Sequence, residues 1–171
     1  MNLTSALVAS QRFAQRAERG KIINIVSEYA TFGGPNLVSY SASKHGLEGL
    51  TKTLAIDLAP NFQVNAIQPG WTATPMTEAV QNFPEMNDEV LRRTPHGRWG
   101  LPSDHGGAAV FLASSASEFV TDVTIPVDGG LSDQITRRHG WTSRAPKRRG
   151  WVTARSSSEP RKGRSSSSIR G

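Results

Sequence analysis

Three short apolar runs, separated by segments with helical periodicity, limit most strongly what this chain folds into. The runs lie at residues 21–26, 63–67 and 123–127, and the first of them, KIINIV, is continuous and rich in β-branched side chains. Such a run is typical of a strand that is buried on both faces of a sheet. Helical segments between successive strands predict parallel strands joined by right-handed crossovers, and therefore an open α/β sheet.

The segments around these runs carry helix signals. We predict helices over residues 2–18 and 39–59, with Ser39 as the N-cap of the second, and a later helix capped by Ser103. Residues 70–100 are different, because prolines interrupt them repeatedly. We expect a long irregular excursion there, with short helical pieces.

A doubly wound domain normally has two βαβαβ halves, and a glycine-rich loop after its first strand binds the phosphates of a dinucleotide. Neither G-x-G-x-x-G nor T-G-x-x-x-G-x-G occurs in this sequence. We therefore predict that residues 1–134 form the C-terminal half of a Rossmann-like doubly wound parallel sheet, with three strands and flanking helices. The N-terminal half that binds the cofactor is expected to be missing.

Charge divides the chain near residue 134. Residues 1–134 carry a net charge of −4, whereas residues 135–171 carry 11 Lys and Arg against one acidic residue. A uniformly basic nucleic-acid-binding domain is therefore excluded. We predict that residues 135–171 are a disordered Arg/Ser-rich tail, because they have too little apolar surface to bury. The alternative is a polybasic arm for nucleic acid or anionic lipid, with Trp141 and Trp151 as anchors.

The residue types present exclude several kinds of site. The chain has no Cys, which excludes a disulfide framework, a thiol nucleophile and a cysteine-based metal site. Its four His residues include no H-x-x-x-H pair, so we expect no metal. The longest apolar run, residues 108–113, is far shorter than the ~20 residues of a membrane span. We expect a cytoplasmic protein; the alternative is mitochondrial import, because residues 1–21 also resemble an amphipathic, Arg-rich transit peptide.

Tyr40 and Lys44 form the first candidate for chemistry. They stand four residues apart at the start of the predicted 39–59 helix, so their side chains share one face. A cation beside a tyrosine stabilises the phenolate and lowers the phenol pKa from about 10, as a proton-transferring tyrosine requires. By itself, the spacing is also typical of a surface lysine beside a half-buried tyrosine.

Other polar residues follow the first two predicted strands. Ser27 comes directly after the first, and Pro69-Gly70 ends the second, at the carboxyl edge where α/β sheets hold their ligands. The Ser27 hydroxyl is suited to hydrogen-bond a substrate carbonyl as charge develops on its oxygen. Thr72 and Thr74 are suited to hold a polar ligand group. Each of these residues also suits a turn or a strand end.

Together the motifs resemble the short-chain dehydrogenase/reductase family. That family has N-x-x-G/S on one helix, a Ser after the fifth strand, Y-x-A-S-K thirteen residues later, and a P-G-x-x-x-T segment. The corresponding stretches here, in the same order, are NLTS at 2–5, INIVS at 23–27, YSASK at 40–44, VNAIQPGWTATPM at 64–76 and IPVDGG at 125–130. The resemblance covers residues 2 to about 132.

Two further stretches bear on the substrate. GRWGLPSD at 97–104 and VFLASSASEFV at 110–120 are most similar to the sugar-acid members of the family, the 2-deoxy-gluconate 3-dehydrogenases and gluconate 5-dehydrogenases. They also fit 3-oxoacyl-carrier-protein reductases. Residues 71–100 resemble the substrate loop of the family, where His96, Arg98 and Trp99 would meet the substrate or serve a structural role.

The resemblance implies a role for each matching residue. Tyr40 would be the general acid for carbonyl reduction and the general base for alcohol oxidation. Lys44 would lower the pKa of Tyr40 and hydrogen-bond the nicotinamide ribose. Ser27 would polarise the carbonyl, and Asn2 would position a water in the proton relay. The nicotinamide side of NAD or NADP would be lined by Tyr40, Lys44, Pro69, Gly70, Trp71, Thr72 and Thr74.

Three functions remain open at this point. The first is an NAD(P)-dependent oxidoreductase that interconverts a secondary alcohol and a ketone, with a sugar-acid-like substrate favoured and the chain alone expected to be inactive. The second is a non-catalytic module that oligomerises through the helices at 2–18 and 39–59, the usual interface of the family. The third is nucleic-acid binding through residues 135–171. We favour the first, with a small-molecule ketone or alcohol and a second copy of the chain as partners.

Overall fold

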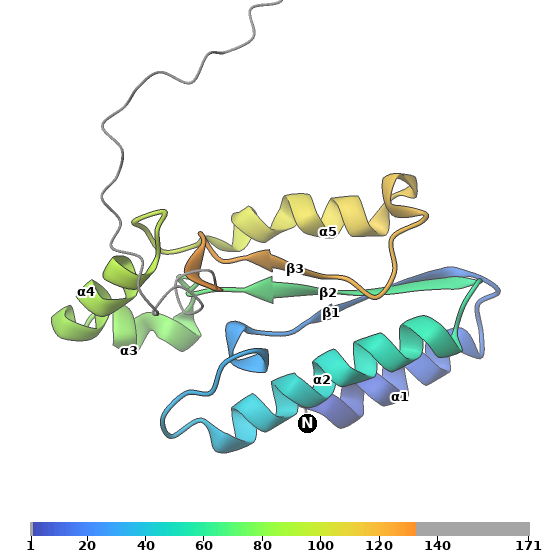
Figure 1. The fold of residues 1–171 in the computed structure, drawn as a ribbon, viewed down its shortest axis with the longest axis horizontal. Coiled ribbons are helices and arrows are strands. Elements are labelled where there is room, and N and C mark those ends of the chain that lie inside the picture. The colour runs from blue at the N-terminus through green and yellow to red at the C-terminus, as the bar shows by residue number, and fades with distance from the viewer. Residues whose placement is uncertain (1, 133–171) are drawn as a thin grey trace, which may run out of the picture. The chain divides into compact units, whose positions relative to one another are not determined.

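The computed structural model describes residues 2–132, and the predicted basic tail at 135–171 lies outside them. The described chain forms one sheet with helices on both faces (Figure 1). All strand pairs are parallel, in the order β1-β2-β3. The strands are β1 (Gly20–Ile25), β2 (Phe62–Pro69) and β3 (Thr124–Val127). The predicted α/β class and the three parallel strands are confirmed.

Helices form a layer on each side of this sheet. The helices α1 (Asn2–Ala14) and α2 (Val38–Asp57) lie on one face, and α5 (Gly106–Ala113) lies on the other (Figure 1). The core under α2 has two clusters, in which apolar side chains of α2 pack against those of the first two strands and their ends. One cluster contains Val26, Ala30, Leu47 and Ala66, and the other contains Leu54, Ala55, Phe62 and Val64.

Burial differs between the two long strands. Val64, Ala66 and Ile67 on the central strand β2 are almost fully buried. On β1, which is an edge of the described sheet, Ile25 is 50% exposed and most other residues are only partly covered. The prediction that residues 21–26 are buried on both faces is therefore wrong for the described chain, because β1 pairs with β2 alone.

Helix boundaries also differ from the prediction. The helix predicted to reach residue 18 ends at Ala14. The Gln15 N–H still donates to the Gln11 carbonyl, but the Arg16 N–H donates only three residues back, to the Phe13 carbonyl. The N-cap of α2 is Leu37, so Ser39 lies inside the helix rather than capping it. Ser103 is not an N-cap either.

The segment around Ser103 begins as a 3₁₀ turn, η3 (Pro102–His105), and α5 starts only at Gly106. The N-cap of this turn is Leu101, whose backbone N–H donates to the Asp104 carboxylate at 2.7 Å. Asp104 is the third residue of the turn, so its carboxylate satisfies the N-cap N–H from within the turn, and Ser103 does not cap it. A short turn, η4 (Ser115–Ser117), follows α5.

The excursion after β2 contains short helical pieces, as predicted. They are η2 (Pro75–Thr77), α3 (Glu78–Gln81) and α4 (Pro84–Arg93). The helices α3 and α4 lie beyond the carboxyl ends of the strands (Figure 1). A further 3₁₀ turn, η1 (Glu28–Ala30), follows β1 at the same edge. The turn after β1 and the excursion after β2 therefore lie at the same end of the sheet.

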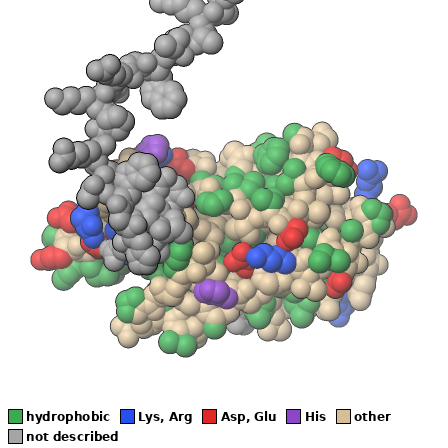
Figure 2. Space-filling model, in the orientation of Figure 1, with side chains coloured by type: hydrophobic (Ala, Val, Ile, Leu, Met, Phe, Trp, Pro, Cys, Tyr) green, Lys and Arg blue, Asp and Glu red, His purple; other side chains and the backbone are tan. Residues whose placement is uncertain are grey.

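Two surface properties complete the description. Hydrophobic side chains gather on the surface over α5 (Figure 2), where Val110 is 69% exposed. Within residues 2–132, no helix combines the length and the apolar character that crossing a membrane requires.

Candidate active site

Ser27 stands at the carboxyl end of β1 as the N-cap of η1. Its side chain is buried, and its Oγ accepts a hydrogen bond from the Tyr29 backbone N–H at 3.3 Å. A hydroxyl that accepts through a lone pair keeps its own proton to donate. The 3₁₀ turn therefore fixes Ser27 at the edge of the sheet and leaves it a donor.

Tyr40 and Lys44 lie on the first turns of α2, and the structure brings them to the end of β1. The Lys44 Nζ lies 5.7 Å from the centroid of the Tyr40 ring. The same Nζ donates to the Ile25 carbonyl at 2.7 Å, two residues before Ser27. Burial lowers the pKa of the Lys44 ammonium. The lysine thus ties the start of α2 to the strand that Ser27 follows.

Asn2 is exposed at the start of α1 and lies beside this turn of α2. Its Nδ2 donates to the Ser43 Oγ at 3.4 Å, and the Ser43 hydroxyl donates to the Tyr40 carbonyl at 2.7 Å. The residue before Lys44 therefore links Asn2 to the backbone of Tyr40. His45 is exposed, and its Nδ1 lies 2.9 Å from the Ser41 carbonyl oxygen.

Pro69 and Gly70 lead from β2 into the next loop. A Cβ on Gly70 would stand 2.8 Å from the Asp128 Cα, so only glycine fits at this approach of two backbones. Beyond it, the loop is joined to the backbone at Gly100: the Ala73 N–H donates to the Gly100 carbonyl at 2.8 Å, and the Gly100 N–H donates to the Trp71 carbonyl at 2.9 Å.

The threonine hydroxyls of this loop form hydrogen bonds within the protein. The Thr72 hydroxyl donates to the Gly70 carbonyl and lies 3.0 Å from the His105 Nε2. The Thr77 hydroxyl donates to the Thr72 carbonyl at 2.7 Å and accepts from the Thr74 N–H at 3.1 Å. Sequence reasoning missed His105 and Thr77, because neither occupies a position in the motifs that drew attention to this loop.

Four aromatic rings connect the separate segments of the site. Tyr29 packs edge-to-face against Tyr40, with centroids 6.2 Å apart, and against Trp71, with centroids 6.4 Å apart. Trp71 packs in the same way against Trp99 at 5.6 Å. The Trp99 indole N–H donates to the Asn87 side chain on α4 at 2.8 Å. This row joins Tyr40 to the excursion, and sequence reasoning did not single out Tyr29 for it.

Glu28, next to Ser27, is one of three residues, with Ser41 and His105, whose side chain leaves a buried polar atom without a hydrogen-bond partner among the described residues. It is only 6% exposed, and its Oε2 finds no hydrogen-bond partner within the described chain. Burial raises its pKa to about 7, against the opposing charge of Arg93, and Asp128 adds to the rise. Burial, and then the neighbouring Glu28, also raise the pKa of the Tyr29 phenol, while Arg93 opposes the rise.

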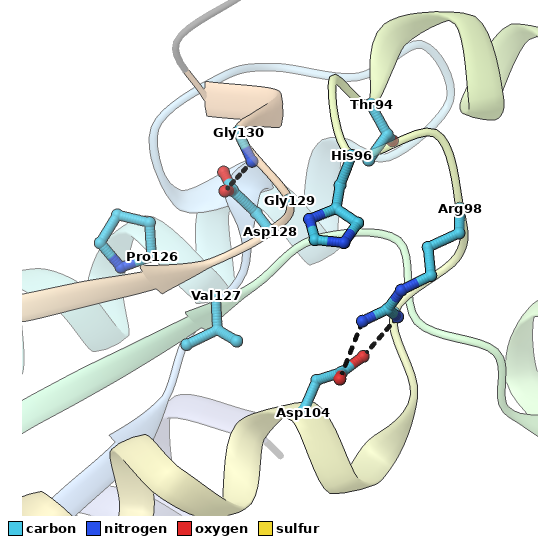
Figure 3. A pocket seen from close by; sticks show the side chains of 10 residues that line it. Thr94, His96, Arg98, Asp104, Pro126, Val127, Asp128, Gly129 and Gly130 are labelled. Atoms are coloured by element: carbon cyan, nitrogen blue, oxygen red, sulfur yellow. Dashed lines mark hydrogen bonds and ion pairs between the residues drawn. The ribbon is translucent and has the colours of Figure 1, made fainter. Parts of the chain in front are cut away.

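A hollow of about 290 Å³ lies beside the end of β3 (Figure 3), lined by Thr94, His96, Arg98, Gly100, Asp104 and residues 126–130. The Arg98 guanidinium donates twice to the Asp104 carboxylate, at 2.7 and 3.0 Å. This hydrogen bonding holds the pKa of Asp104 well below its usual range. Arg98 and Trp99 therefore both have partners within the chain, which favours the structural alternative for these two residues.

The donors at this edge suit the nicotinamide and ribose end of a dinucleotide, which needs an ammonium, hydroxyls and backbone polar groups. The pyrophosphate needs a row of backbone N–H groups at a glycine-rich turn before a helix. Residues 2–132 contain no such turn. The site thus fits one end of the cofactor.

Comparison with known proteins identifies relatives over the same residues. A family model described as Enoyl-(Acyl carrier protein) reductase matches residues 1–132. The 2-dehydro-3-deoxy-D-gluconate 5-dehydrogenase of Dickeya dadantii (strain 3937) is 46% identical over 135 residues, which are 76% of this chain and 53% of the relative. The chain spans about half the length of the curated relatives it matches.

Two solved structures share the fold. One is a putative 2-deoxy-D-gluconate 3-dehydrogenase from Agrobacterium tumefaciens with bound NADP, at 42% identity and a TM-score of 0.74, covering 76% of this chain and 55% of that one. The other is a gluconate 5-dehydrogenase from Burkholderia cenocepacia J2315 in complex with NADP and tartrate, at 38% identity and a TM-score of 0.74, covering 77% and 53%.

Proposed function

Because the chain belongs to the short-chain dehydrogenase/reductase family, we propose that its carboxyl edge serves the NAD(P)-dependent interconversion of a secondary alcohol and a ketone. The observation that carries the proposal is the position of Lys44, which contacts the Tyr40 ring and is bonded to the strand end just before Ser27. This juxtaposition supports a proton donor, a cation and a carbonyl-binding hydroxyl in one site.

In the proposed reaction, a bound nicotinamide supplies the hydride to the carbonyl carbon or accepts it from the alcohol. The Tyr40 hydroxyl gives its proton to the carbonyl oxygen in reduction and takes it back in oxidation. The Lys44 ammonium stabilises the phenolate that remains. Ser27 donates a hydrogen bond to the oxygen on which charge develops.

The remaining predicted site residues serve the cofactor and the proton path in this proposal. Lys44 and Tyr40 hold the nicotinamide ribose, and Asn2, beside the first turns of α2, positions a water that leads to Lys44. The ring itself is lined by the loop after β2, at Pro69, Gly70, Trp71, Thr72 and Thr74. The hydrogen bonds of Thr72 and Thr77 support this loop as a rigid wall.

We propose a sugar acid as the substrate. The names of the similar proteins support this class, since they are dehydrogenases of gluconate and deoxygluconate. The Burkholderia protein is also in complex with tartrate, a hydroxylated carboxylic acid. Two solved relatives contain NADP, which supports NADP as the cofactor.

We also propose that residues 1–134 act as one part of such a domain and that α1 and α2 pair with a second copy of the chain. Both helices carry exposed apolar side chains: Val8 is 47% exposed, Val38 82% and Ile56 75%. Large apolar groups gathered on helix faces are typical of protein–protein contacts. Nucleic-acid binding through residues 135–171 remains the less favoured alternative.

A fusion protein tests the proposed function. It joins this chain to the part of the Dickeya dadantii enzyme that lies outside the match. The two parts keep the order that they have in the relative. We expect the fusion protein to oxidise NADH or NADPH when given 5-keto-D-gluconate, and to act at least about tenfold more slowly on an acetoacetyl thioester of similar size. Failure to turn over any sugar-acid ketone, in a fusion protein shown to be folded, would contradict the proposal.

A further inference from the structure

The three arginines of the excursion differ in the partners of their guanidinium groups. The Arg92 Nε donates to the Glu89 carboxylate at 2.9 Å on the surface of α4. Arg98 makes its two-point bond to Asp104. Arg93, although half-buried, forms neither an ion pair nor a side-chain hydrogen bond with any residue from 2 to 132.

The backbone around Arg93 is fixed beside the candidate site. Arg93 is the last residue of α4, and the next residue, Thr94, is buried with its hydroxyl bonded to the Val90 carbonyl at 2.8 Å. Two residues further on, the His96 N–H donates to the Gly129 carbonyl at 3.0 Å. These bonds hold the end of α4 against the turn that follows β3.

The charge of Arg93 reaches the residues directly after Ser27. It lowers the pKa of both Glu28 and Tyr29, against the larger effect of their burial. Tyr29 in turn packs against the Tyr40 ring. Arg93 therefore acts electrostatically on the turn beside the proposed catalytic pair, and no carboxylate among residues 2–132 forms an ion pair with it.

A half-buried guanidinium without a bonded anion is costly, and its planar fork matches a carboxylate in a two-point bond. We propose that Arg93 binds the carboxylate of a sugar-acid substrate whose carbonyl lies against Ser27 and Tyr40. This inference rests on the proposed function and deepens it, because it names the group that distinguishes sugar acids from neutral sugars.

Glu28 makes this site sensitive to pH. The charged and titratable groups that face it are Arg93 from α4, Asp128 after β3, and Tyr29 within its own turn. Below pH 7 the Glu28 carboxyl is neutral and leaves the full charge of Arg93 to the substrate. Above pH 7 it ionises and competes for the guanidinium, so carboxylate binding weakens as the pH rises through about 7.

The test uses the 171-residue chain and requires no turnover. D-gluconate and D-glucitol are titrated separately at pH 6 and followed by NMR; they have the same carbon chain, but only gluconate has a carboxylate. We expect gluconate to bind about ten- to a hundredfold more tightly, which is the effect of one charge-assisted two-point bond. Arg93→Gln should remove this preference, whereas Arg92→Gln, the same change at the neighbouring position, should keep it.

Several results would overturn the inference: no preference for gluconate in the unmodified chain, an unchanged preference in Arg93→Gln, or an equal loss in Arg92→Gln. If circular dichroism shows that Arg93→Gln does not fold, Arg93→Lys replaces it, because it keeps the positive charge and removes the two-point hydrogen bond of the guanidinium. An undiminished preference for gluconate in Arg93→Lys would count against the role of Arg93. Glu28→Gln should abolish the loss of gluconate affinity between pH 6 and 8. Inactivity of the fusion protein contradicts the proposed function separately from this binding measurement.

Discussion

The loop after β2 and the turn after β1 stand at the same edge of the sheet, yet their polar groups are partnered to very different extents. In the loop, the hydroxyls of Thr72 and Thr77 and the backbone at Gly100 are all hydrogen-bonded within the chain. In the turn, Glu28 keeps one oxygen without a hydrogen bond in the described chain, and the nearby Arg93 forms no ion pair there.

This difference distinguishes a rigid, hydrogen-bonded loop from a turn whose polar groups are available to a ligand. Satisfied polar groups make a loop rigid, and a rigid loop holds a flat ring in place without reacting to it. Unsatisfied buried groups destabilise the fold and are retained where a ligand completes them. Under the proposed function, this difference suits the loop to the cofactor, and the turn with the end of α4 to the substrate.

The largest effect is expected at Glu28. Its pKa is raised from 4.5 to about 7 in the folded chain, so between these values the folded state holds a proton that the unfolded state has lost. Stability should fall by about 3 kcal/mol as the pH rises from 4.5 to 7, and then level off. Urea unfolding at pH 4.5 and 8 measures this fall.

Glu28→Gln should remove that pH-dependent difference and make the chain more stable than the unmodified protein at pH 8. Glu18→Gln, at an exposed position between α1 and β1, should change stability by less than about 0.5 kcal/mol at either pH. The same pH dependence of stability in the unmodified chain and in Glu28→Gln would show that the raised pKa does not belong to Glu28.

Gly70→Ala tests the rigidity of the loop after β2. Its Cβ would meet the Asp128 backbone at 2.8 Å, so the two segments must move apart, at a cost of about 1–3 kcal/mol. Gly49→Ala on α2 is the matched control: its Cβ meets nothing within 4 Å, and it should stabilise the helix by about 0.5–1 kcal/mol. Equal effects of the two substitutions on the midpoint of thermal unfolding would contradict this close approach.

Thr77→Val should have a smaller effect, because it removes one hydroxyl and keeps the shape. That hydroxyl bonds both the Thr72 carbonyl and the Thr74 N–H, so we expect a loss of about 1–2 kcal/mol and shifted amide signals in residues 72–74. Thr53→Val, where the exposed hydroxyl bonds only the Gly49 carbonyl, should change little. Unmoved signals in the loop would show that Thr77 does not fix it.

Dinucleotide binding to the 171-residue chain should be the weakest effect. A few hydrogen bonds at the nicotinamide end give about 0.5–1.5 kcal/mol each, whereas association costs on the order of 4–15 kcal/mol. We therefore expect NADH and NADPH to bind with millimolar dissociation constants at best in calorimetric titrations. A micromolar constant would mean that the chain, or an oligomer of it, holds the whole cofactor.

These regions also differ in how far sequence alone predicts them. The strands and the excursion follow from apolar periodicity and from the prolines, and the carboxyl-edge rule places Ser27 and Pro69-Gly70 at one edge of the sheet. The grouping of Ser27 with Tyr40 and Lys44 came instead from the resemblance to the family. The starts of helices were harder to predict from the sequence. Leu101, not Ser103, is the N-cap of η3, and its backbone N–H donates to the Asp104 carboxylate.

Contacts between distant segments were not predictable. The row from Tyr40 through Tyr29 to Trp71 and the partnership of Thr72 with His105 depend on how the excursion folds back over the sheet. The same is true of Glu28 and Arg93, which are 65 positions apart in the sequence. No local pattern marks either residue, since each alone reads as an ordinary surface charge.

The central claim is that the Tyr40 hydroxyl moves the proton at this edge. The most direct test compares Tyr40→Phe with Tyr29→Phe in the fusion protein, since each removes one phenol oxygen from the same pair of packed rings. Loss of a general acid costs about 10²–10⁴ in rate. We predict that Tyr40→Phe lowers oxidation of the reduced cofactor by at least about a hundredfold with cofactor affinity nearly unchanged, while Tyr29→Phe keeps most of the rate. A Tyr40→Phe enzyme that retains more than about a tenth of the activity would contradict the account.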